Sequence, residues 1–472
     1  MKTEDTYIST DILAKSDPEE TLAVHTNNAI TYLKQVIKWY FKNISYISNL
    51  LGISYDEIVA RLFAMVYLHD IGKSNPSFQK YIREKEGRQR PFPPHALLSA
   101  HFIINSVIPI RINGINQYPE TLAVLSHHTP YYNDLYFECC YDADPETQFN
   151  LHNKYGLFCK NYGLLFYDYL PFAYASYFGK EYPFVISRPD LNKKFGSTLS
   201  TIKETLLRDD RPKLQLRYLH SLFVSILHYS DWLSSGKSYF RYSEEAITPQ
   251  LELQARSYPQ FNGWYDYQTQ AADIKENMLL CAPTGMGKTE AALWWANANL
   301  EGGKILYLLP TRVTANAMYA RLRRLLGNNT GISHGTAVLR IAEDEKWNYA
   351  SILTKRLIYG TFMSPTTVAT VDHLLLSIFN WRHWEMIEQN ASNASIIFDE
   401  IHAYDFYTIA LISQIIGSLS RVGSRFAFLS ATLPNYLKEY FTDTLIDCQP
   451  TLVEDKQFSQ LVRHRINFFA MD

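Results

Sequence analysis

A glycine-rich segment in the second half of the chain has the residue types of a phosphate-binding loop. Residues 282–289 read A-P-T-G-M-G-K-T and lie between an apolar run and an amphipathic run, the strand, loop and helix context that such a loop requires. Gly285 and Gly287 permit unusual dihedral angles, so backbone N–H groups at the helix start can surround phosphates. Lys288 would reach the β and γ phosphates, and the Thr289 hydroxyl would bind Mg²⁺. The predicted ATP contacts of the loop are Pro283, Thr284, Gly285, Met286, Gly287, Lys288 and Thr289.

A pair of carboxylates further along the chain supports this interpretation. Asp399 and Glu400 directly follow the apolar run Ile396–Phe398, which puts them at the carboxyl end of a parallel strand, facing the loop. We expect Asp399 to hold Mg²⁺ through water and Glu400 to act as a catalytic residue that polarises the attacking water. The loop starts with Ala282 where the generic pattern has glycine. The alternative is that the loop is a chance glycine-rich helix start and the acidic pair is merely solvated. This alternative is weaker, because the two elements have the order and spacing of a nucleotide site.

Histidine and aspartate residues in the first half of the chain have the types and grouping of a metal centre. The candidate ligands are His25, His69, Asp70, His95, His127, His128 and Asp231. A solitary histidine is more often a core or surface residue, so the adjacent pairs at 69–70 and 127–128 carry the argument. Neighbouring residues on a helix point about 100° apart, so His69 and Asp70 suit a helix end where the carboxylate bridges two cations and the imidazole binds one.

The donor set indicates which metals and which chemistry to expect. Imidazole and carboxylate together suit Mn, Fe, Co or Ni better than Mg alone, because nitrogen donors favour the borderline metals. Two such ions would activate a water molecule and stabilise the leaving oxygen of a phosphodiester. Lys73, close after the His69–Asp70 pair, could neutralise the scissile phosphate; the alternative is a solvated cation at a helix end.

The patterns around these residues predict two kinds of domain. Apolar residues recur at helical spacing through residues 20–130 without strand alternation, and helical patterning returns from about 200 to 235. Residues 131–195 have weak periodicity and suggest a long connection or insertion with a few short elements. Short apolar runs then alternate with helical stretches, which indicates a buried parallel sheet. The predicted strands are Met278–Cys281, Ile305–Leu309, Ile396–Phe398 and Phe426–Leu429.

We therefore expect a multi-domain chain: an all-α domain at 1–238, a linker at 239–264 that contains Pro249, Pro259 and Gly263, and an α/β domain at 265–455. Residues 456–472 would lead towards a further domain. No apolar run is long enough to span a membrane and the N-terminus lacks a signal peptide pattern, so we expect a cytoplasmic protein. The five cysteines show no C-x-x-C spacing, which argues against a disulfide framework or a structural zinc site. With a net charge of −2, any DNA binding must come from local basic grooves.

The second half resembles the superfamily-two helicases, whose motifs occur here in order. The resemblance implies a RecA-like domain in which Gln268 reads adenine and Asp399-Glu400-Ile401-His402 is the acidic motif. The implied contacts with the DNA backbone are Thr311, Arg312, Thr370 and Asp372. The motif that couples hydrolysis to movement would be Ser430, Ala431 and Thr432.

The first half resembles the HD nuclease domain of the CRISPR-associated nuclease/helicase of type I systems, the Cas3 family. That pattern is a first His, an H-D-x-G-K segment, a His, a His-His pair and an Asp in D-W-x-x-S, and here every position is filled. The resemblance implies that His69, Asp70 and Lys73 act in catalysis and that the seven candidate ligands hold two metal ions. His101 and His228 occupy no ligand position, and we expect them to pack between helices. For the basic runs Arg208–Arg217 and Arg321–Arg324, a solvated helix face is the favoured interpretation over phosphate contacts.

The family resemblance also implies a biological role. A crRNA-guided Cascade complex would open a target duplex, the HD site would cut the displaced single-stranded DNA as an endonuclease and exonuclease, and the ATP-dependent motor would translocate 3′ to 5′ in antiviral defence. An anti-CRISPR inhibitor is a further partner that the resemblance leaves open; no membrane partner is expected. Two other classes stay open: a nucleotide phosphohydrolase regulated by its ATP domain, and a non-catalytic adaptor.

A superfamily-two motor needs a second RecA-like domain, which supplies arginines to the ATP site. After Thr432 about forty residues remain, and Arg463 and Arg465 do not match the Q-x-x-x-R-x-x-R spacing of that domain. We expect this chain by itself to bind ATP weakly and hydrolyse it poorly while its HD site still cuts single-stranded DNA. An assay of phosphate release with and without single-stranded DNA checks this, and robust DNA-stimulated turnover would contradict it.

Overall fold

The computed structural model describes residues 12–84, 94–128, 164–184, 213–236, 247–259, 261–300, 303–381, 383–444 and 449–455. The chain divides into two compact units, Met1–Phe240 and Arg241–Asp472. Several expectations concern residues outside the described ranges: the link at 456–472, most of the insertion at 131–195, part of the basic run 208–217, and the thiols Cys139, Cys140, Cys159 and Cys448. Within the described ranges, no helix combines the length and apolarity that a bilayer crossing needs.

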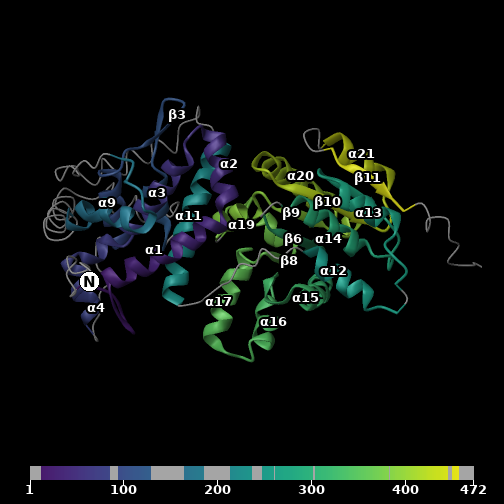
Figure 1. Ribbon diagram of the computed structural model, residues 1–472, viewed down its shortest axis with the longest axis horizontal. Coiled ribbons are helices and arrows are strands. Elements are labelled where there is room, and N and C mark those ends of the chain that lie inside the picture. The colour runs from purple at the N-terminus through teal and green to yellow at the C-terminus, as the bar shows by residue number, and fades with distance from the viewer. Residues whose placement is uncertain are drawn as a thin grey trace, which may run out of the picture. The chain divides into compact units, whose positions relative to one another are not determined.

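The first unit is helical, as predicted. Its helices are α1 (Leu22–Trp39), α2 (Phe41–Leu51), α3 (Tyr55–Leu68), α4 (Pro76–Arg83), α5 (His95–Ile104), α6 (Pro119–Ser126), α9 (Leu164–Phe178) and α11 (Lys213–Gly236), with the 3₁₀ turn η1 (Ile71–Ser74). Thr21 and Ser54 cap α1 and α3 by accepting hydrogen bonds from Val24 N and Glu57 N, which fixes where these helices begin. Helices α1, α3 and α11 pack against one another (Figure 1), so residues near both ends of this unit meet in one core.

Two small hairpins interrupt the helices. They are β1 (Leu13–Ser16) with β2 (Glu19–Thr21), and β3 (Ile110–Ile112) with β4 (Ile115–Gln117), both antiparallel. The expectation of helix without strand alternation over residues 20–130 is therefore wrong at 110–117. Asn113 and Gly114 have φ of 50° and 79°, as a two-residue hairpin turn requires, and their N-G dipeptide between I-R-I and I-N-Q was the available signal.

Helix α9 lies inside the segment predicted as a connection or insertion. Tyr167, Leu170 and Tyr174 are buried, and the helix packs against α3. Residues 164–178 of this segment therefore form a core helix, which is longer than the short elements expected there. Its aromatic residues occur on several faces, which hid the helical period in the sequence.

The second unit contains a seven-stranded parallel sheet in the order β11-β5-β10-β9-β6-β8-β7, which confirms the predicted α/β class. Its strands are β5 (Met278–Cys281), β6 (Ile305–Leu309), β7 (Thr330–Ser333), β8 (Thr366–Thr370), β9 (Ser395–Phe398), β10 (Arg425–Ser430) and β11 (Thr451–Glu454). Apolar runs in the sequence predicted β5, β6, β9 and β10. Strands β7, β8 and β11 were not predicted, because polar residues, threonine among them, interrupt their apolar runs, although threonine suits a strand.

Helices pack around this sheet (Figure 1). They are α12 (Ile247–Arg256), α13 (Asp266–Asp273), α14 (Lys288–Asn299), α15 (Arg312–Leu326), α16 (Ala337–Asp344), α17 (Tyr349–Gly360), α18 (Val371–Leu375), α19 (Trp384–Ala391), α20 (Phe406–Leu419) and α21 (Asn435–Thr444), with 3₁₀ turns η3 (Gly327–Asn329), η4 (Ile401–Ala403) and η5 (Ser420–Val422). Helix α14 contacts β9 and β10, whereas α15 contacts β6, β8 and β7.

Part of the predicted linker at 239–264 is helical. Helix α12 packs on α14 and α15 and buries Leu251 and Ala255. Residues 247–256 therefore belong to the second unit. The sequence prediction relied on Pro249, but proline is tolerated in the first turn of a helix, where its missing N–H would have no partner.

Candidate metal centre and nucleotide site

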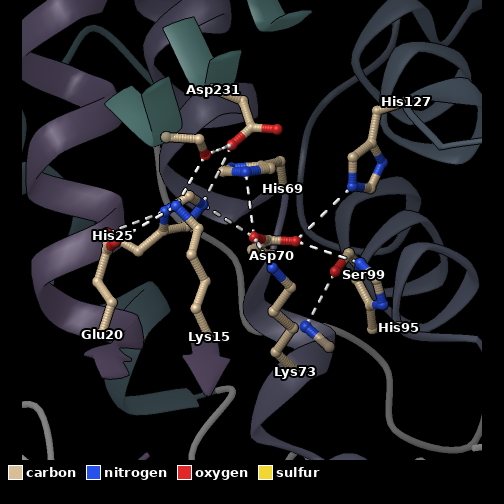
Figure 2. A network of polar contacts seen from close by, with 12 residues as sticks. Lys15, Glu20, His25, His69, Asp70, Lys73, His95, Ser99, His127 and Asp231 are labelled. Carbon is tan, nitrogen blue, oxygen red and sulfur yellow. Dashed lines mark hydrogen bonds and ion pairs between the residues drawn. The ribbon is translucent and has the colours of Figure 1, made fainter. Parts of the chain in front are cut away.

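The Asp70 carboxylate lies at the centre of the candidate metal site (Figure 2). Helix α3 ends at Leu68, so His69 and Asp70 occupy the helix end where the sequence placed them. Asp70 Oδ2 is 3.1 Å from His25 Nε2 and 3.4 Å from His69 Nε2. Its other oxygen, Oδ1, is 3.3 Å from His95 Nε2 and 3.7 Å from His127 Nε2. The two oxygens of one carboxylate thus face two different sets of imidazoles.

The structure brings all seven predicted ligands together as two groups. One is His25, His69 and Asp231, from α1, the end of α3 and α11. The other is Asp70, His95, His127 and His128, from the start of η1, from α5 and from the end of α6. Within each group the ligand atoms lie within 4.8 Å of one another. This spacing suits one cation per group, with Asp70 shared between them.

The orientation of the imidazole rings tests whether metal ions fit this site. His69 Nδ1 donates to Val66 O at 2.7 Å and His127 Nδ1 donates to Val124 O, so both rings turn a bare Nε2 towards Asp70. His25 Nδ1 lies 3.2 Å from Glu20 Oε1, which orients the third ring in the same way. Nε2 of His69 and His127 and Oδ1 of Asp70 are buried without a hydrogen-bond partner. A buried polar atom without a partner costs about 1–3 kcal/mol, so the donor set fits bound cations.

The electrostatics of the second group favour neutral imidazoles and an ionised carboxylate. Burial lowers the pKa of His95 to about 4, and burial with the neighbouring His127 and His95 lowers the pKa of His128 to about 2. Burial by itself would raise the pKa of Asp70, but Lys73 and His69 hold it well below its usual range. Metal ligands must be in these protonation states.

The pKa of His25, in the first group, is raised instead of lowered. Its burial would lower its pKa, but hydrogen bonds to the Asp231 and Asp70 carboxylates raise that pKa to about 9. A proton on His25 therefore offsets part of the negative charge of the two carboxylates, Asp70 and Asp231, as a bound cation would. Metal binding to this group would displace that proton, as is usual for imidazole ligands.

Lys73 is not the solvated cation that the sequence left as an alternative. It is 8% exposed, and its Nζ lies 2.6 Å from Asp70 Oδ2. The ammonium therefore belongs to the site. Its predicted contact with a scissile phosphate stays a prediction.

Several supporting residues escaped sequence analysis. Glu20 orients His25, and Ser99 Oγ accepts from Gly72 N at 2.9 Å, which ties η1 to α5. The ammonium of Lys15 donates to Ser235 Oγ, which in turn donates to Asp231 Oδ1. These polar residues have no spacing motif of their own, and only folding reveals their partners.

The two histidines expected to pack between helices both lie in the helical core. His101 is buried in α5, and His228 Nε2 donates to His127 O at 3.0 Å while its ring stacks on Trp232. His228 therefore supports the backbone of a predicted ligand.

The phosphate-binding loop follows β5 and leads into α14, as predicted. Gly285 and Gly287 have φ of 80° and 87°, in the left-handed region that glycine adopts without strain. Gln268 Nε2 donates to Gly287 O at 3.1 Å, and its Oε1 accepts from Tyr265 N at 2.9 Å. Gln268 therefore holds the loop, and its predicted contact with adenine stays a prediction.

The acidic motif lies at the same edge of the sheet. Asp399 follows β9, and its Oδ2 accepts a hydrogen bond from Tyr307 Oη at 2.8 Å. Burial, followed by the charge of Glu400, raises the pKa of Asp399. Lys288 Nζ lies 3.9 Å from Glu400 Oε1, so the loop and the acidic motif meet although β10 separates their strands.

The predicted DNA and coupling residues also lie at strand ends. Thr311 follows β6 and caps α15 by accepting from Thr314 N, and Thr370 ends the neighbouring β8. Arg312 and Asp372 follow them and are exposed.

Ser430 ends β10, and its Oγ donates to Thr432 O across Ala431. His402 Nδ1 lies 2.9 Å from Ser430 Oγ and 3.4 Å from Glu400 Oε2. This contact joins the acidic motif to the predicted coupling motif, whose role stays a prediction.

Both halves of the chain match known protein families. Residues 14–240 match the family "Cas3, HD domain", and residues 265–440 match the "DEAD/DEAH box helicase" family. The putative CRISPR-associated nuclease/helicase Cas3 of Methanocaldococcus jannaschii is 30% identical in an alignment of 403 residues that covers 78% of this chain and 54% of the relative. The CRISPR-associated endonuclease/helicase Cas3 of Thermus thermophilus is 27% identical in an alignment of 280 residues that covers 48% of this chain and 30% of the relative. The crystal structure of T. fusca Cas3 with ATP has the same fold, with a TM-score of 0.53 at 18% identity over 93% of this chain and 52% of that one.

A helical HD domain followed by a RecA-like domain defines the class of HD nuclease/helicases. Within that class, the chain belongs to the Cas3 family of CRISPR-associated nuclease/helicases. It spans about half the length of the M. jannaschii relative.

Gly72 provides a test of how η1 is held against α5. A Cβ atom on Gly72 would lie 2.2 Å from His95 O and 3.0 Å from Leu98 Cβ, so Gly72→Ala must push the backbone of η1 away from α5. We expect a loss of about 1–3 kcal/mol of stability and weaker Mn²⁺ binding, because Asp70 would move away from His95. Thermal denaturation and titration calorimetry measure both. Gly417→Ala, where an added Cβ meets nothing within 4 Å, is the control; equal effects of the two changes would contradict the expectation.

Metal binding should also stabilise the helical unit. Mn²⁺ at about 100 times its Kd should add about 2.7 kcal/mol of stability and raise Tm by several degrees, and a chelator should reverse the effect. In Asp70→Ala the metal-induced increase in Tm should disappear, because the bridging carboxylate is gone. An increase retained in that variant would place the metal elsewhere.

Proposed function

We propose that this chain cuts single-stranded DNA at the HD centre in a metal-dependent reaction and binds ATP in its RecA-like domain. The observation that carries the proposal is the Asp70 carboxylate with one group of imidazoles at each of its oxygens. Family membership supports the nuclease/helicase class, the site supports cleavage of a phosphodiester, and single-stranded DNA as the substrate is what the family resemblance implies.

The residues of the chain have distinct parts in this reaction. His25, His69 and Asp231 would hold one cation, His95, His127 and His128 the other, and Asp70 would bridge them. The bound ions would supply an activated water molecule and stabilise the leaving oxygen. Lys73 pairs with Asp70 from one side and is placed to offset the negative charge of an approaching phosphate. Val66 O and Val124 O keep His69 and His127 in the tautomer that binds metal.

The RecA-like domain would serve the same DNA. Lys288 and Thr289 would hold the phosphates and Mg²⁺, while Glu400 would polarise the attacking water. Thr311, Arg312, Thr370 and Asp372 would contact the DNA backbone from the ends of two neighbouring strands. In the whole protein we propose translocation 3′ to 5′ on the strand displaced by a crRNA-guided Cascade complex, which agrees with the relatives being named CRISPR-associated nuclease/helicases.

Incubation with circular single-stranded DNA and Mn²⁺, Co²⁺, Ni²⁺ or Mg²⁺ tests the nuclease function. We expect nicking with the borderline metals that falls by at least about 10³-fold in Asp70→Ala, because losing the bridging ligand disrupts both metal positions. Lys288→Ala is the matched control and should retain nicking in the absence of ATP, because it changes only the phosphate-binding loop. Hydrolysis of a mononucleotide panel without DNA cleavage would instead favour a nucleotide phosphohydrolase, and an absence of bound metal would favour an adaptor.

A further inference from the structure

Arg321 on α15 contacts the phosphate-binding loop. Its Nη1 donates to Thr289 Oγ1 at 3.1 Å, and its Nη2 pairs with Glu290 Oε1. The expectation of a solvated helix face for Arg321–Arg324 is therefore wrong for Arg321, and also for Arg323, whose Nη1 lies 3.2 Å from Asp344 Oδ2. It holds for Arg324, which is exposed and donates from Nε to Ala320 O, the carbonyl one turn earlier in the helix.

The contact with Thr289 opposes the predicted role of that residue. The Thr289 hydroxyl oxygen is expected to bind Mg²⁺, but here it accepts a hydrogen bond from a guanidinium. A divalent cation on the same oxygen would lie within a few ångströms of the positive charge of Arg321 and would be repelled by it. Glu290 holds the guanidinium in this position through a charge-assisted pair. Mg²⁺ binding at Thr289 thus requires Arg321 to move.

The other end of α15 carries predicted DNA contacts. Thr311 caps the helix and Arg312 is its first residue, nine residues or about 14 Å from Arg321. The helix buries Ala315, Tyr319 and Leu322 and packs along β6, β8 and β7. A helix held along one face in this way moves as a unit, so a displacement at its N-terminus is transmitted to Arg321.

We propose that Arg321 is a positioning residue that restricts Mg²⁺ at Thr289, and that DNA bound at Thr311 and Arg312 releases it by shifting α15. This inference rests on the proposed DNA contacts of the RecA-like domain. It makes Mg·ATP binding responsive to DNA without any contact between DNA and the nucleotide.

The test measures the affinity of the whole chain for a fluorescent ATP analogue in EDTA and in Mg²⁺, with and without oligo(dT). The quantity of interest is the magnesium gain, the Kd in EDTA divided by the Kd in Mg²⁺. In the wild-type chain, DNA should increase the gain. Arg321→Met should increase it about three- to tenfold without DNA, because the competing charge is removed, and should abolish the further effect of DNA.

Three variants control the interpretation. Glu290→Gln weakens the anchor of the guanidinium and should change the gain in the same direction as Arg321→Met, which keeps the inference testable if one variant folds poorly. Arg321→Lys should give a magnesium gain between those of the wild-type chain and Arg321→Met, because its ammonium keeps the positive charge. Arg324→Met removes a charge from the same helix away from Thr289 and should leave the gain unchanged.

Two results would overturn the inference, and a third separates it from the proposed function. If Arg321→Met weakens nucleotide binding equally in EDTA and Mg²⁺, Arg321 is a direct phosphate ligand. If oligo(dT) binds the wild-type chain by anisotropy but leaves its magnesium gain unchanged, α15 does not transmit DNA binding. If oligo(dT) does not bind the wild-type chain at all, the proposed DNA contacts fail and the coupling fails with them, while the nicking assay still judges the HD centre independently.

Discussion

The arrangement of the candidate site in the helical unit depends on the contacts of the buried Asp70 carboxylate. An ionised carboxylate removed from water is unfavourable unless positive charge and hydrogen-bond donors surround it. Lys73 supplies positive charge beside Asp70, and the imidazoles of His25, His69, His95 and His127 surround its two oxygens. These five residues come from five separate elements. The helices that deliver them are held together by an apolar core in which α1 lies on α3 and α11. The same convergence leaves the bare Nε2 atoms of His69 and His127 facing Asp70, an arrangement that bound cations would complete.

The second unit is organised by a different constraint, the common edge of a parallel sheet. Because all seven strands run the same way, their carboxyl ends lie together, and the loops that follow them meet there. The phosphate-binding loop, the acidic motif and Ser430 follow β5, β9 and β10, while the predicted DNA contacts follow β6 and β8. His402 lies within reach of both Glu400 and Ser430, and Arg321 reaches Thr289 from α15. The predicted nucleotide and DNA contacts are thus neighbours through one sheet and one helix, which would give the unit a physical basis for coupling them.

Sequence patterns predicted the fold class and the long buried strands, because apolar runs such as Ile305–Leu309 report burial directly. They failed where local composition and tertiary role disagree. Strands β7 and β8 contain threonines, α9 has aromatic residues on several faces, and α12 has a proline near its start. The hairpin at Asn113 and Gly114 carried a turn signal that three-residue strands were too short to reinforce. Each failure occurred where periodicity was weak and packing against another element decided the structure.

The sequence by itself determined which chemical groups were available: imidazoles and carboxylates in the first half, a phosphate-binding loop and its acidic partner in the second. It did not specify that the seven ligands form two groups about Asp70, that Lys73 is buried against that carboxylate, or that Arg321 holds Thr289. Those facts depend on distances between residues far apart in the chain, such as the 3.2 Å between His25 Nε2 and Asp231 Oδ1. Such distances are set by how α1 packs on α11, and helical periodicity states only which face of each helix is apolar. Folding likewise decides which nitrogen of a histidine can face a metal, because it places a carbonyl beside the other nitrogen, which donates a hydrogen bond to it.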